Sequence, residues 1–497
     1  MTDKYEAIGM ADLMAQSGVG FGTSGARGLA DAMSDRVSYL YTVGFLQYLE
    51  RSGSIHPGEA VALAGDLRPS TPRILHAVAA AVRDLGYQPL HCGSIPSPAV
   101  ACYAMHAAIA SMMVTGSHIP DDRNGIKFNK PDGEILKEDE RGIREQVVMV
   151  SRTLFDEAGR FSTEVAQLPA EDSVAARHYV ARYLDFLPSG CLAGARVLVY
   201  EHSTVAAGLL VEIFAGLGAD VLRRGYSDTF VPVDTEAVRS EDVELAKAWA
   251  ADEHFDLFVS ADGDGDRPLV GDELGNWLRG DLLGVLTARF LDADAVVTPV
   301  SSNTAVEKSA WFARVIRTRI GSPFVIEGMQ RASDEGAQRV VGYEANGGFL
   351  TMTPLPFDGH VLSPLPTRDA VLVALSVLLL ARRQGVPVSQ LSQLLPARFT
   401  ASDRLKAFPT DLSRVRIDAL ARDSDLIVEQ FPGLGDVAEV DQTDGLRITF
   451  ANGEIVHLRP SGNAPELRCY TEADGVERAQ ALNAACLDRL QSWRRQD

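Results

Sequence analysis

The chain has 497 residues, of which 46% are hydrophobic and 23% are charged. At roughly 150 residues per domain, this length predicts three or four domains and excludes a single small binding module. The composition is that of a globular protein, so extensive disorder is excluded. The net charge of −20 argues against general binding to nucleic acid or to an anionic membrane, which would repel the protein. A small phosphorylated substrate held in a local basic pocket remains compatible with this charge.

The cysteines and the apolar segments indicate the cellular compartment in which the protein works. The five cysteines, at positions 92, 102, 191, 469 and 486, show no C-x-x-C spacing, so we expect neither a disulfide framework nor a structural zinc site. The N-terminal segment is polar and lacks the apolar core of a secretory signal. The longest apolar run, 370–381, is too short to span a bilayer and predicts a buried helix. These features favour a cytoplasmic protein with no membrane partner.

Strands and helices are predicted to alternate over most of the chain. We expect strands at 60–64, 87–91 and 111–114, separated by helices at 70–85 and 97–107. The same order returns at 196–200, 204–217, 220–223, 235–251 and 255–260, and again at 295–300, 303–313, 315–318, 323–335 and 339–343. This alternation predicts three βαβαβ units with mainly parallel pairing. Gly86 and Gly218 suit left-handed helix ends, and Ser203 suits the start of a helix.

The three units read as diverged repeats of one architecture. Each final strand runs into an unusual polar turn: Thr115-Gly116-Ser117-His118, then Asp262-Gly263-Asp264-Gly265-Asp266-Arg267, then Tyr343-Glu344-Ala345-Asn346-Gly347-Gly348. Ligands of open α/β sheets bind beyond the carboxyl ends of the strands. Three sheets that deliver polar loops at equivalent ends therefore predict one shared cleft.

After about residue 395 the pattern changes to a smaller α+β domain. We expect short strands at 436–441, 447–450, 454–458 and 466–471, a tight hairpin at Asn452-Gly453, and a final helix at 476–493. The fold class is thus α/β, with three mixed-sheet βαβαβ domains and a C-terminal α+β domain around a central cleft. The predicted domains are 1–165, 166–285, 286–395 and 396–497.

The alternating carboxylates Asp262, Asp264 and Asp266 predict a site for a hard divalent cation such as Mg²⁺. The simpler alternative is a solvated acidic turn. An EF-hand is rejected, because Arg267 stands where that loop needs glycine and because the preceding segment reads as a strand rather than a helix. Arg267 next to a metal loop is well suited to grip a phosphate.

Ser117 follows a glycine at a strand end, where a serine is exposed enough to act as a nucleophile. The turn does not match the G-x-S-x-G pattern of α/β-hydrolases, and taken alone it reads more simply as a helix cap or turn. His118 could orient the serine or relay a proton. Lys127, ten residues after Ser117, could return to the same site.

Two further stretches have the composition of phosphate cradles. Residues 22–28, a glycine-rich stretch that contains Arg27, allow close backbone approach but lack the Walker A lysine pattern, so nucleotide binding is not implied. The segment Arg459-Pro-Ser-Gly-Asn offers a guanidinium, a hydroxyl, an amide and backbone N–H groups. Ordinary turns are equally good readings of both stretches. Glu344 and Asn346 offer a carboxylate and an amide that suit vicinal sugar hydroxyls.

Taken together, from about residue 22 to about residue 472, these motifs resemble the α-D-phosphohexomutase superfamily, and they stand in the family's order. The resemblance implies a four-domain enzyme with a deep central cleft. It implies that Ser117 carries the transferable phosphoryl group, and that Asp262, Asp264 and Asp266 bind Mg²⁺ together with the phosphoserine.

The resemblance also implies roles for the remaining residues. Arg27 and Lys127 would lie near the reacting phosphate, with Lys127 as general acid or base, and Glu344 and Asn346 would recognise the sugar. The non-reacting phosphate would be held by the C-terminal loop, which comprises Arg459, Ser461, Gly462, Asn463 and the nearby Arg468. The reaction implied moves a phosphoryl group between O1 and O6 of a hexose phosphate, through a hexose 1,6-bisphosphate that also serves as activator.

The motifs do not decide which hexose is the substrate or how many chains assemble. The last loop reads R-P-S-G-N-A-P where relatives often have R-P-S-G-T-E-P. The sugar loop reads E-A-N-G-G, whereas mutases that act on both mannose and glucose phosphates have E-M-S-G-H. The stretch 204–238 looks most like phosphomannomutases, with phosphoglucosamine mutase and phosphoglucomutase as alternatives. A metal-dependent sugar phosphatase and a catalytically silent sugar-phosphate-binding protein are remoter alternatives. We expect a cytoplasmic monomer or homodimer that acts on a small sugar phosphate.

Overall fold

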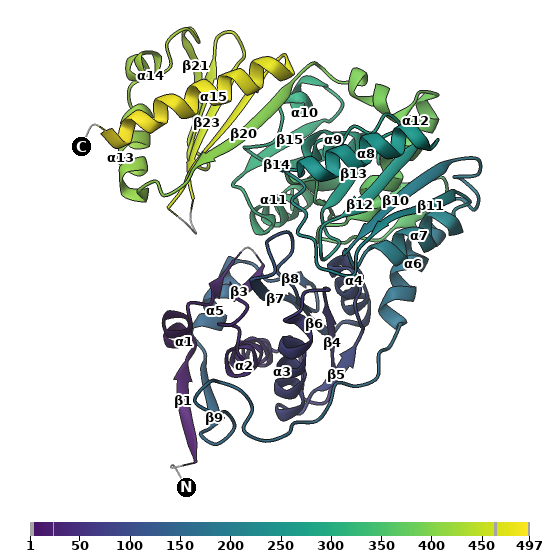
Figure 1. The fold of residues 1–497 in the computed structure, drawn as a ribbon, viewed down its shortest axis with the longest axis vertical. Helices are drawn as coiled ribbons and strands as arrows, with labels where there is room; N and C mark the ends of the chain where they lie inside the picture. The colour runs from purple at the N-terminus through teal and green to yellow at the C-terminus, as the bar shows by residue number, and fades with distance from the viewer. Residues whose placement is uncertain (1–3, 23, 462–464, 496–497) are drawn as a thin grey trace.

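The computed structural model describes residues 4–22, 24–461 and 465–495. The chain folds around four main sheets, and the four units follow one another along an arc from the N-terminal unit to the C-terminal unit (Figure 1). The first three units combine helices with mixed sheets, and the last packs helices on an antiparallel sheet. The predicted fold class is therefore confirmed.

The first unit holds a seven-stranded sheet in the order β2-β3-β7-β6-β4-β5, with β8 paired to β7. Its elements are β2 (Gly20–Phe21), β3 (Gly25–Leu29), α2 (Asp35–Arg51), β4 (Ala60–Gly65), α3 (Thr71–Asp84), β5 (Gln88–His91), α4 (Ser97–Ala107), β6 (Ala110–Val114), β7 (Arg123–Lys130), β8 (Gly133–Glu134) and α5 (Lys137–Arg144). Strand β4 is parallel to β5 and β6, whereas β7 is antiparallel to β6. A separate ribbon is formed by β1 (Tyr5–Gly9) and β9 (Val147–Ser151), next to α1 (Met10–Ser17) (Figure 1).

The second and third units each contain a four-stranded sheet, ordered β11-β10-β12-β13 and β15-β14-β16-β17. The second unit comprises α6 (Val174–Phe186), β10 (Arg196–His202), α7 (Ala207–Gly216), β11 (Asp220–Tyr226), α8 (Ser240–Asp252), β12 (Leu257–Ala261) and β13 (Pro268–Asp272). The third comprises α9 (Gly280–Phe290), β14 (Ala295–Pro299), α10 (Ala305–Lys308), β15 (Arg314–Thr318), α11 (Ser322–Asp334), β16 (Val340–Tyr343), β17 (Phe349–Thr351), the hairpin β18 (Leu355–Phe357) and β19 (His360–Leu362), α12 (Ala370–Gln384) and the 3-10 helix η1 (Val388–Leu394).

The three sheets share one topology, which confirms the predicted repeat. In the first sheet the order β5-β4-β6-β7 is equivalent to β11-β10-β12-β13 and to β15-β14-β16-β17. In each, three parallel strands are followed by a fourth that returns antiparallel to the third. The polar turns at residues 115–122, 262–267 and 344–348 are the three equivalent connections into that fourth strand. The topology therefore places the predicted functional loops at the same end of each sheet.

The C-terminal unit is an antiparallel sheet in the order β20-β24-β23-β22-β21. Its elements are β20 (Phe399–Leu405), α13 (Thr410–Leu420), α14 (Ser424–Gln430), β21 (Val437–Asp441), β22 (Leu446–Phe450), β23 (Ile455–Pro460), β24 (Leu467–Ala473), α15 (Val476–Ser492) and the 3-10 helix η2 (Trp493–Arg495). The predicted hairpin is confirmed, because β22 and β23 pair directly and the Gly453 N–H donates to the Phe450 carbonyl at 2.8 Å.

Three local expectations change. Ser203 does not cap a helix, because α7 begins at Ala207; its hydroxyl instead accepts the Val231 N–H at 2.7 Å. The helix expected at 303–313 spans only Ala305–Lys308, since the backbone turns left-handed at Ala310 (φ 54°). Helix α9 runs across residue 285 and packs on α12 and β16, so we propose that the third domain begins near Gly280 instead.

Helix α12 is the buried helix that the apolar run predicted, and it packs mainly against α9. Across residues 4–22, 24–461 and 465–495, no single helix is long and apolar enough to cross a membrane. Helix α12 and η1 would reach that length only together, and they meet at an angle of 79°.

Candidate active site

Ser117 lies in the turn between β6 and β7 and is almost completely buried. Its φ of 57° is in the left-handed region, which costs a non-glycine residue about 1–3 kcal/mol and is found most often at functional sites. Two contacts hold it there: its N–H donates to Thr115 Oγ1 at 2.7 Å, and its hydroxyl donates to Asp262 Oδ2 at 2.6 Å. The serine of the first loop therefore faces the acidic loop of the second unit.

Arg68 organises the serine turn, and the sequence analysis missed it. Its side chain is fully buried and donates to the carbonyls of Ser117 and Ile119, both at 2.7 Å. The ring of Phe230 covers the guanidinium, with its centroid 4.1 Å away. A side chain at Gly116 would place its Cβ 2.6 Å from the Arg68 Nε, so glycine is required beside it. The only available signal was the position of Arg68 just after β4, at the carboxyl end of a parallel strand.

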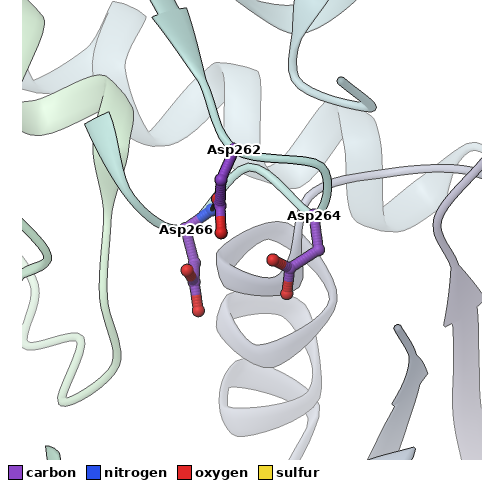
Figure 2. Close-up of side chains that lie close together, drawn as sticks. All are labelled: Asp262, Asp264 and Asp266. Carbon is purple, nitrogen blue, oxygen red and sulfur yellow. Dashed lines mark hydrogen bonds between the residues drawn. The ribbon is translucent and has the colours of Figure 1, made fainter. Parts of the chain in front are cut away.

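The three aspartates of the second loop converge. Asp262, Asp264 and Asp266 are buried, their carboxylates extend to the same side of the loop (Figure 2), and one oxygen of each lies within 4.8 Å of the others. Within the described residues, Oδ1 of Asp264 and Oδ1 of Asp266 are buried and have no hydrogen-bond partner. Orphaned carboxylate oxygens at one point are the donor set that a hard divalent cation takes. The residues present therefore fit Mg²⁺.

The charges of this cluster are not equivalent. Burial, together with the neighbouring Asp264 and Asp266, raises the pKa of Asp262 to about 8. Burial would also raise the pKa of Asp266, but Arg368, Lys127 and Arg267 outweigh it and hold that pKa well below its usual range. Cations around the cluster thus already compensate part of its negative charge.

The serine turn and the acidic loop meet closely at Gly263. A Cβ on this residue would lie 2.9 Å from the Ser117 carbonyl and 3.1 Å from the Phe230 ring. Such distances leave no space for a side chain. Gly263 is therefore needed to bring the second unit against the serine of the first.

A pocket next to Ser117 is lined by four cationic side chains, Arg27, Lys127, Arg267 and Arg368. Lys127, on β7, forms ion pairs with both Asp264 and Asp266. Burial alone would lower the pKa of Lys127, but these two carboxylates raise it above its usual value. Burial and the neighbouring Arg267 lower the pKa of Arg27 to about 10, which leaves it charged at neutral pH. Four cations beside one hydroxyl form a strong anion site.

His118 lies beside Ser117, with Nδ1 3.4 Å from Oγ. Burial, Arg267 and Arg27 hold the pKa of the imidazole far below its usual value. His118 is therefore neutral at physiological pH and a weak base. It can orient the serine, but in this state it does not supply a positive charge.

In the third loop Glu344 and Asn346 are both buried, and Arg368, which the sequence analysis also missed, joins this loop to the acidic loop. Arg368 Nε donates to Asp266 Oδ2 at 2.9 Å and Nη1 donates to Glu344 Oε2 at 3.3 Å. The Asn346 side-chain oxygen accepts the Gly348 N–H at 2.8 Å, so it shapes the loop and leaves only the amide N–H groups for a ligand. No local signal marks Arg368, because its partners Asp266 and Glu344 are distant in the chain and Asp266 comes from the second unit.

The C-terminal arginines lie in a row across three strands. Arg459 on β23 is directly opposite Arg468 on β24, which is opposite Arg404 on β20. Opposed residues of antiparallel strands share a face of the sheet, so three guanidinium groups lie on one face. Ser461 is buried, and its N–H donates to the Glu466 carbonyl at 2.8 Å. Gly462, Asn463 and the neighbouring Ala464 lie outside the described residues. Arg404 was missed because β20 was not predicted.

The comparisons with known proteins agree with this arrangement. The chain matches three models described as phosphoglucomutase/phosphomannomutase: alpha/beta/alpha domain I over residues 18–151, alpha/beta/alpha domain III over 279–399 and the C-terminal domain over 412–489. A phosphomannomutase of Sinorhizobium fredii is 42% identical over 472 residues, which cover 95% of this chain and 98% of that protein. A phosphomannomutase of Salmonella muenchen is 42% identical over 483 residues, 97% of each chain.

The chain belongs to the phosphoglucomutase/phosphomannomutase family. It is a mutase of the phosphohexomutase type. Among solved structures, a putative phosphomannomutase of Thermus thermophilus shares the fold with a TM-score of 0.71 at 20% identity, over 94% of this chain and 98% of that one. A crystal structure described as N-acetylglucosamine-phosphate mutase of the alpha-D-phosphohexomutase superfamily has a TM-score of 0.56 at 13% identity, over 95% and 96% of the two chains.

Proposed function

We propose that this phosphohexomutase is a phosphomannomutase, which interconverts mannose 1-phosphate and mannose 6-phosphate. The observation that carries the chemistry is the 2.6 Å contact between the Ser117 hydroxyl and Asp262, beside a pocket of four cations. The identity of 42% to two proteins named phosphomannomutase supports the sugar. A phosphoglucosamine mutase of Listeria innocua is only 26% identical over 465 residues, 91% of this chain and 94% of that protein.

Ser117 is proposed to carry the phosphoryl group. In the first half-reaction the bond between phosphorus and Ser117 Oγ breaks, a bond to the free sugar hydroxyl forms, and hexose 1,6-bisphosphate results. In the second half the other phosphate returns to Ser117 after the intermediate has turned over. Phosphoryl transfer of this kind depends on positioning and charge neutralisation more than on covalent assistance. The charges of Arg27, Lys127, Arg267 and Arg368 provide that neutralisation.

Asp262, Asp264 and Asp266 are proposed to hold Mg²⁺ together with the phosphate on Ser117. When bound, the cation would neutralise charge on the transferring phosphoryl group. Lys127 is proposed as the general acid that protonates Ser117 Oγ when this oxygen leaves, and its amine then takes up the proton lost by the attacking sugar hydroxyl. Its raised pKa keeps it protonated for that role, and the same amine can take up a proton in the reverse step. His118 orients the serine.

The sugar ring is proposed to bind Glu344 and the Asn346 amide, and the non-reacting phosphate to bind Arg459, Ser461, Gly462, Asn463 and Arg468. Hexose 1,6-bisphosphate would act as the activator that phosphorylates Ser117. We further propose that the enzyme works in the cytoplasm as a monomer or homodimer.

Two measurements test this function. A coupled assay with Mg²⁺ and catalytic hexose 1,6-bisphosphate should show interconversion of the mannose phosphates, and intact-protein mass spectrometry should show one phosphoryl group, mapped to Ser117. Release of inorganic phosphate as the main product would replace the mutase by a sugar phosphatase. Binding of sugar phosphate without turnover would leave only a binding protein.

A further inference from the structure

Glu236 lies in the connection between β11 and α8, a segment of the second unit that is tied to the active site at two points. Phe230 of this segment covers Arg68 beneath the serine turn. The Thr235 hydroxyl donates to the backbone carbonyl of Asn346 in the sugar loop at 2.8 Å. Glu236 directly follows Thr235, so its backbone is held beside the sugar loop.

The Glu236 side chain lines three adjoining cavities of the cleft. One is shared with Arg279, Ala345 of the sugar loop and Tyr470 of the C-terminal sheet. Another is shared with Arg468. The carboxylate therefore lines a cavity with the loop proposed to read the sugar and another with Arg468, one of the arginines proposed to hold its phosphate.

The Glu236 carboxylate acts on Tyr470 through its charge, which raises the pKa of that phenol. This carboxylate is open to the solvent of the cleft, and within the described part of the chain it makes neither a hydrogen bond nor an ion pair through its side chain. Reduced hydration raises the pKa of Glu236, Arg267 lowers this pKa, and the carboxylates of Asp234 and Glu344 raise it further. Glu236 thus shares one electrostatic environment with Glu344.

Glu236 acts on the arginines around it through its charge, which raises the pKa of Arg468, but these arginines have closer carboxylate partners. Arg279 is 3.6 Å from Asp281, and Arg468 is 4.0 Å from Glu466, so both have carboxylates of their own. An additional unpaired negative charge in a cleft that receives phosphate weakens phosphate binding unless it makes a compensating contact. The compensating group must donate hydrogen bonds without negative charge, and the hydroxyls of a sugar ring are such donors.

We propose that Glu236 is a second sugar-binding carboxylate, which accepts hydrogen bonds from ring hydroxyls of the hexose phosphate opposite Glu344. This inference rests on the proposed function, because it assigns a further residue to the same substrate. Two carboxylates from different units hold the ring from two sides, whereas the arginines hold only its phosphates. Glu236 therefore also retains the bisphosphate in the cleft while it turns over.

The test compares Glu236→Gln with Asp403→Asn in the full-length enzyme. Asp403 is an exposed carboxylate that lines two of these three cavities but not the one next to the sugar loop, so its substitution removes an equal charge from the same region. For Glu236→Gln we expect kcat/KM with mannose 1-phosphate to fall about 10- to 100-fold, the range of a lost charge-assisted hydrogen bond. The requirement for added bisphosphate should rise, and Tm should not change. Asp403→Asn should change kcat/KM by less than about threefold.

Two further measurements distinguish hydrogen bonding to the ring hydroxyls from a purely electrostatic effect of the Glu236 charge on the cleft. Inhibition by inorganic phosphate, which has no ring hydroxyls, should be unchanged or tighter in Glu236→Gln. Glu236→Asp keeps the charge but withdraws it by one methylene, and should lose most of the same activity. A Glu236→Gln enzyme with unchanged or higher kcat/KM would overturn the inference while wild-type mutase activity upholds the proposed function. A wild-type protein without mutase activity would overturn both.

Discussion

Arg459 lies against Asp444, with its Nε 3.0 Å from Asp444 Oδ2. The same carboxylate oxygen accepts the N–H of Ile320, in the third unit, at 2.9 Å. Asp444 therefore joins an arginine of the proposed phosphate site to the neighbouring unit. Arg459 is thus held in place, through Asp444, by a contact between the third and fourth units, and it is positioned in this way before a phosphate binds.

We expect Arg459→Ala to raise KM more than it lowers kcat, because Arg459 is proposed to hold the phosphate that is not reacting. A charge-assisted hydrogen bond contributes about 1.5–3 kcal/mol, so kcat/KM should fall roughly 10- to 100-fold or somewhat more. Steady-state kinetics with mannose 1-phosphate measures this. Arg489→Ala, an exposed arginine on α15 of the same unit, is the control. A change below about threefold would place the non-reacting phosphate elsewhere.

We expect Ser117→Ala to lower kcat by at least about 10³-fold, since loss of the nucleophile removes the covalent route. The Ser117 hydroxyl makes one short contact, to Asp262, so the fold and Tm should be retained. Incubation with hexose 1,6-bisphosphate should add one phosphoryl group to the wild type and none to the variant, by intact-protein mass spectrometry. Activity close to that of the wild type in the alanine variant would exclude the phosphoserine mechanism.

The three polar loops could be predicted because each follows a buried strand and breaks the local pattern. The runs that end at Val114, Ala261 and Tyr343 are entirely apolar or small and are fully buried, so the polar residues after them stand out. Equivalent ends of parallel strands lie at one edge of each sheet, and this predicted the shared cleft. The fourth strand of each sheet was not recognised, since segments such as Arg123–Lys130 carry glycine, asparagine and lysine, which have low strand propensity.

Arg68 and Arg368 could not be predicted, because an isolated arginine in a sequence reads as a surface cation. Arg368 depends on carboxylates that are distant in the chain, Asp266 and Glu344. Arg68 pairs with the nearby Asp66, but the carbonyls that it holds, such as that of Ser117, are distant in the chain. Glu236 is a similar case, since only the tertiary fold places it in the cleft. The residues proposed to carry out the chemistry stand in recognisable sequence motifs. The residues that position them do not.

We expect Asp264→Asn to weaken Mg²⁺ binding and activity together. The substitution removes one of three anionic ligands and also one of the two carboxylates paired with Lys127. Calorimetric titration with Mg²⁺ and the Mg²⁺ dependence of kcat measure the two effects separately. Asp228→Asn, an exposed aspartate outside the cluster, is the control. Activity that is unchanged and insensitive to a chelator would mean that the loop is only an acidic turn.

We expect stability to fall on acidification because His202 is buried and neutral. Burial lowers the pKa of His202 from about 6.5 to about 4, while its Nε2 contacts the Ala261 carbonyl at 2.8 Å. The unfolded chain takes up this proton first, so the contribution is complete above pH 6.5 and is lost between pH 6.5 and 4. The full loss corresponds to about 3 kcal/mol.

Urea unfolding tests this prediction. The free energy of unfolding should change less between pH 7 and pH 5 for His202→Gln than for the wild type or for His56→Gln, a change at an exposed histidine. Equal pH dependence in all three proteins would contradict the assignment.

The last prediction concerns the hexose. A mutase must bind its bisphosphate in two orientations, which favours contacts to O3 and O4, because these lie near the axis of turnover and are the same in mannose and glucose. Glu344, held by Arg368, is the acceptor proposed for them. We therefore expect mannose phosphates to be substrates and glucose phosphates to be poorer or comparable ones. Glu344→Gln should lower activity on every hexose rather than change the preference.

Specificity constants for mannose, glucose and glucosamine 1-phosphates decide between these sugars. The 2-position would be read only weakly by contacts to O3 and O4, so mannose and glucose should differ by less than about tenfold, or roughly 1.4 kcal/mol in transition-state binding. Glucosamine carries a cationic 2-substituent, which the unpaired carboxylate of Glu236 would attract if it lay near C2. A preference of more than about tenfold for glucosamine 1-phosphate would overturn the assignment to mannose and leave the mutase chemistry in place. In that case Glu236→Gln should reduce the preference for glucosamine, whereas Glu344→Gln should not.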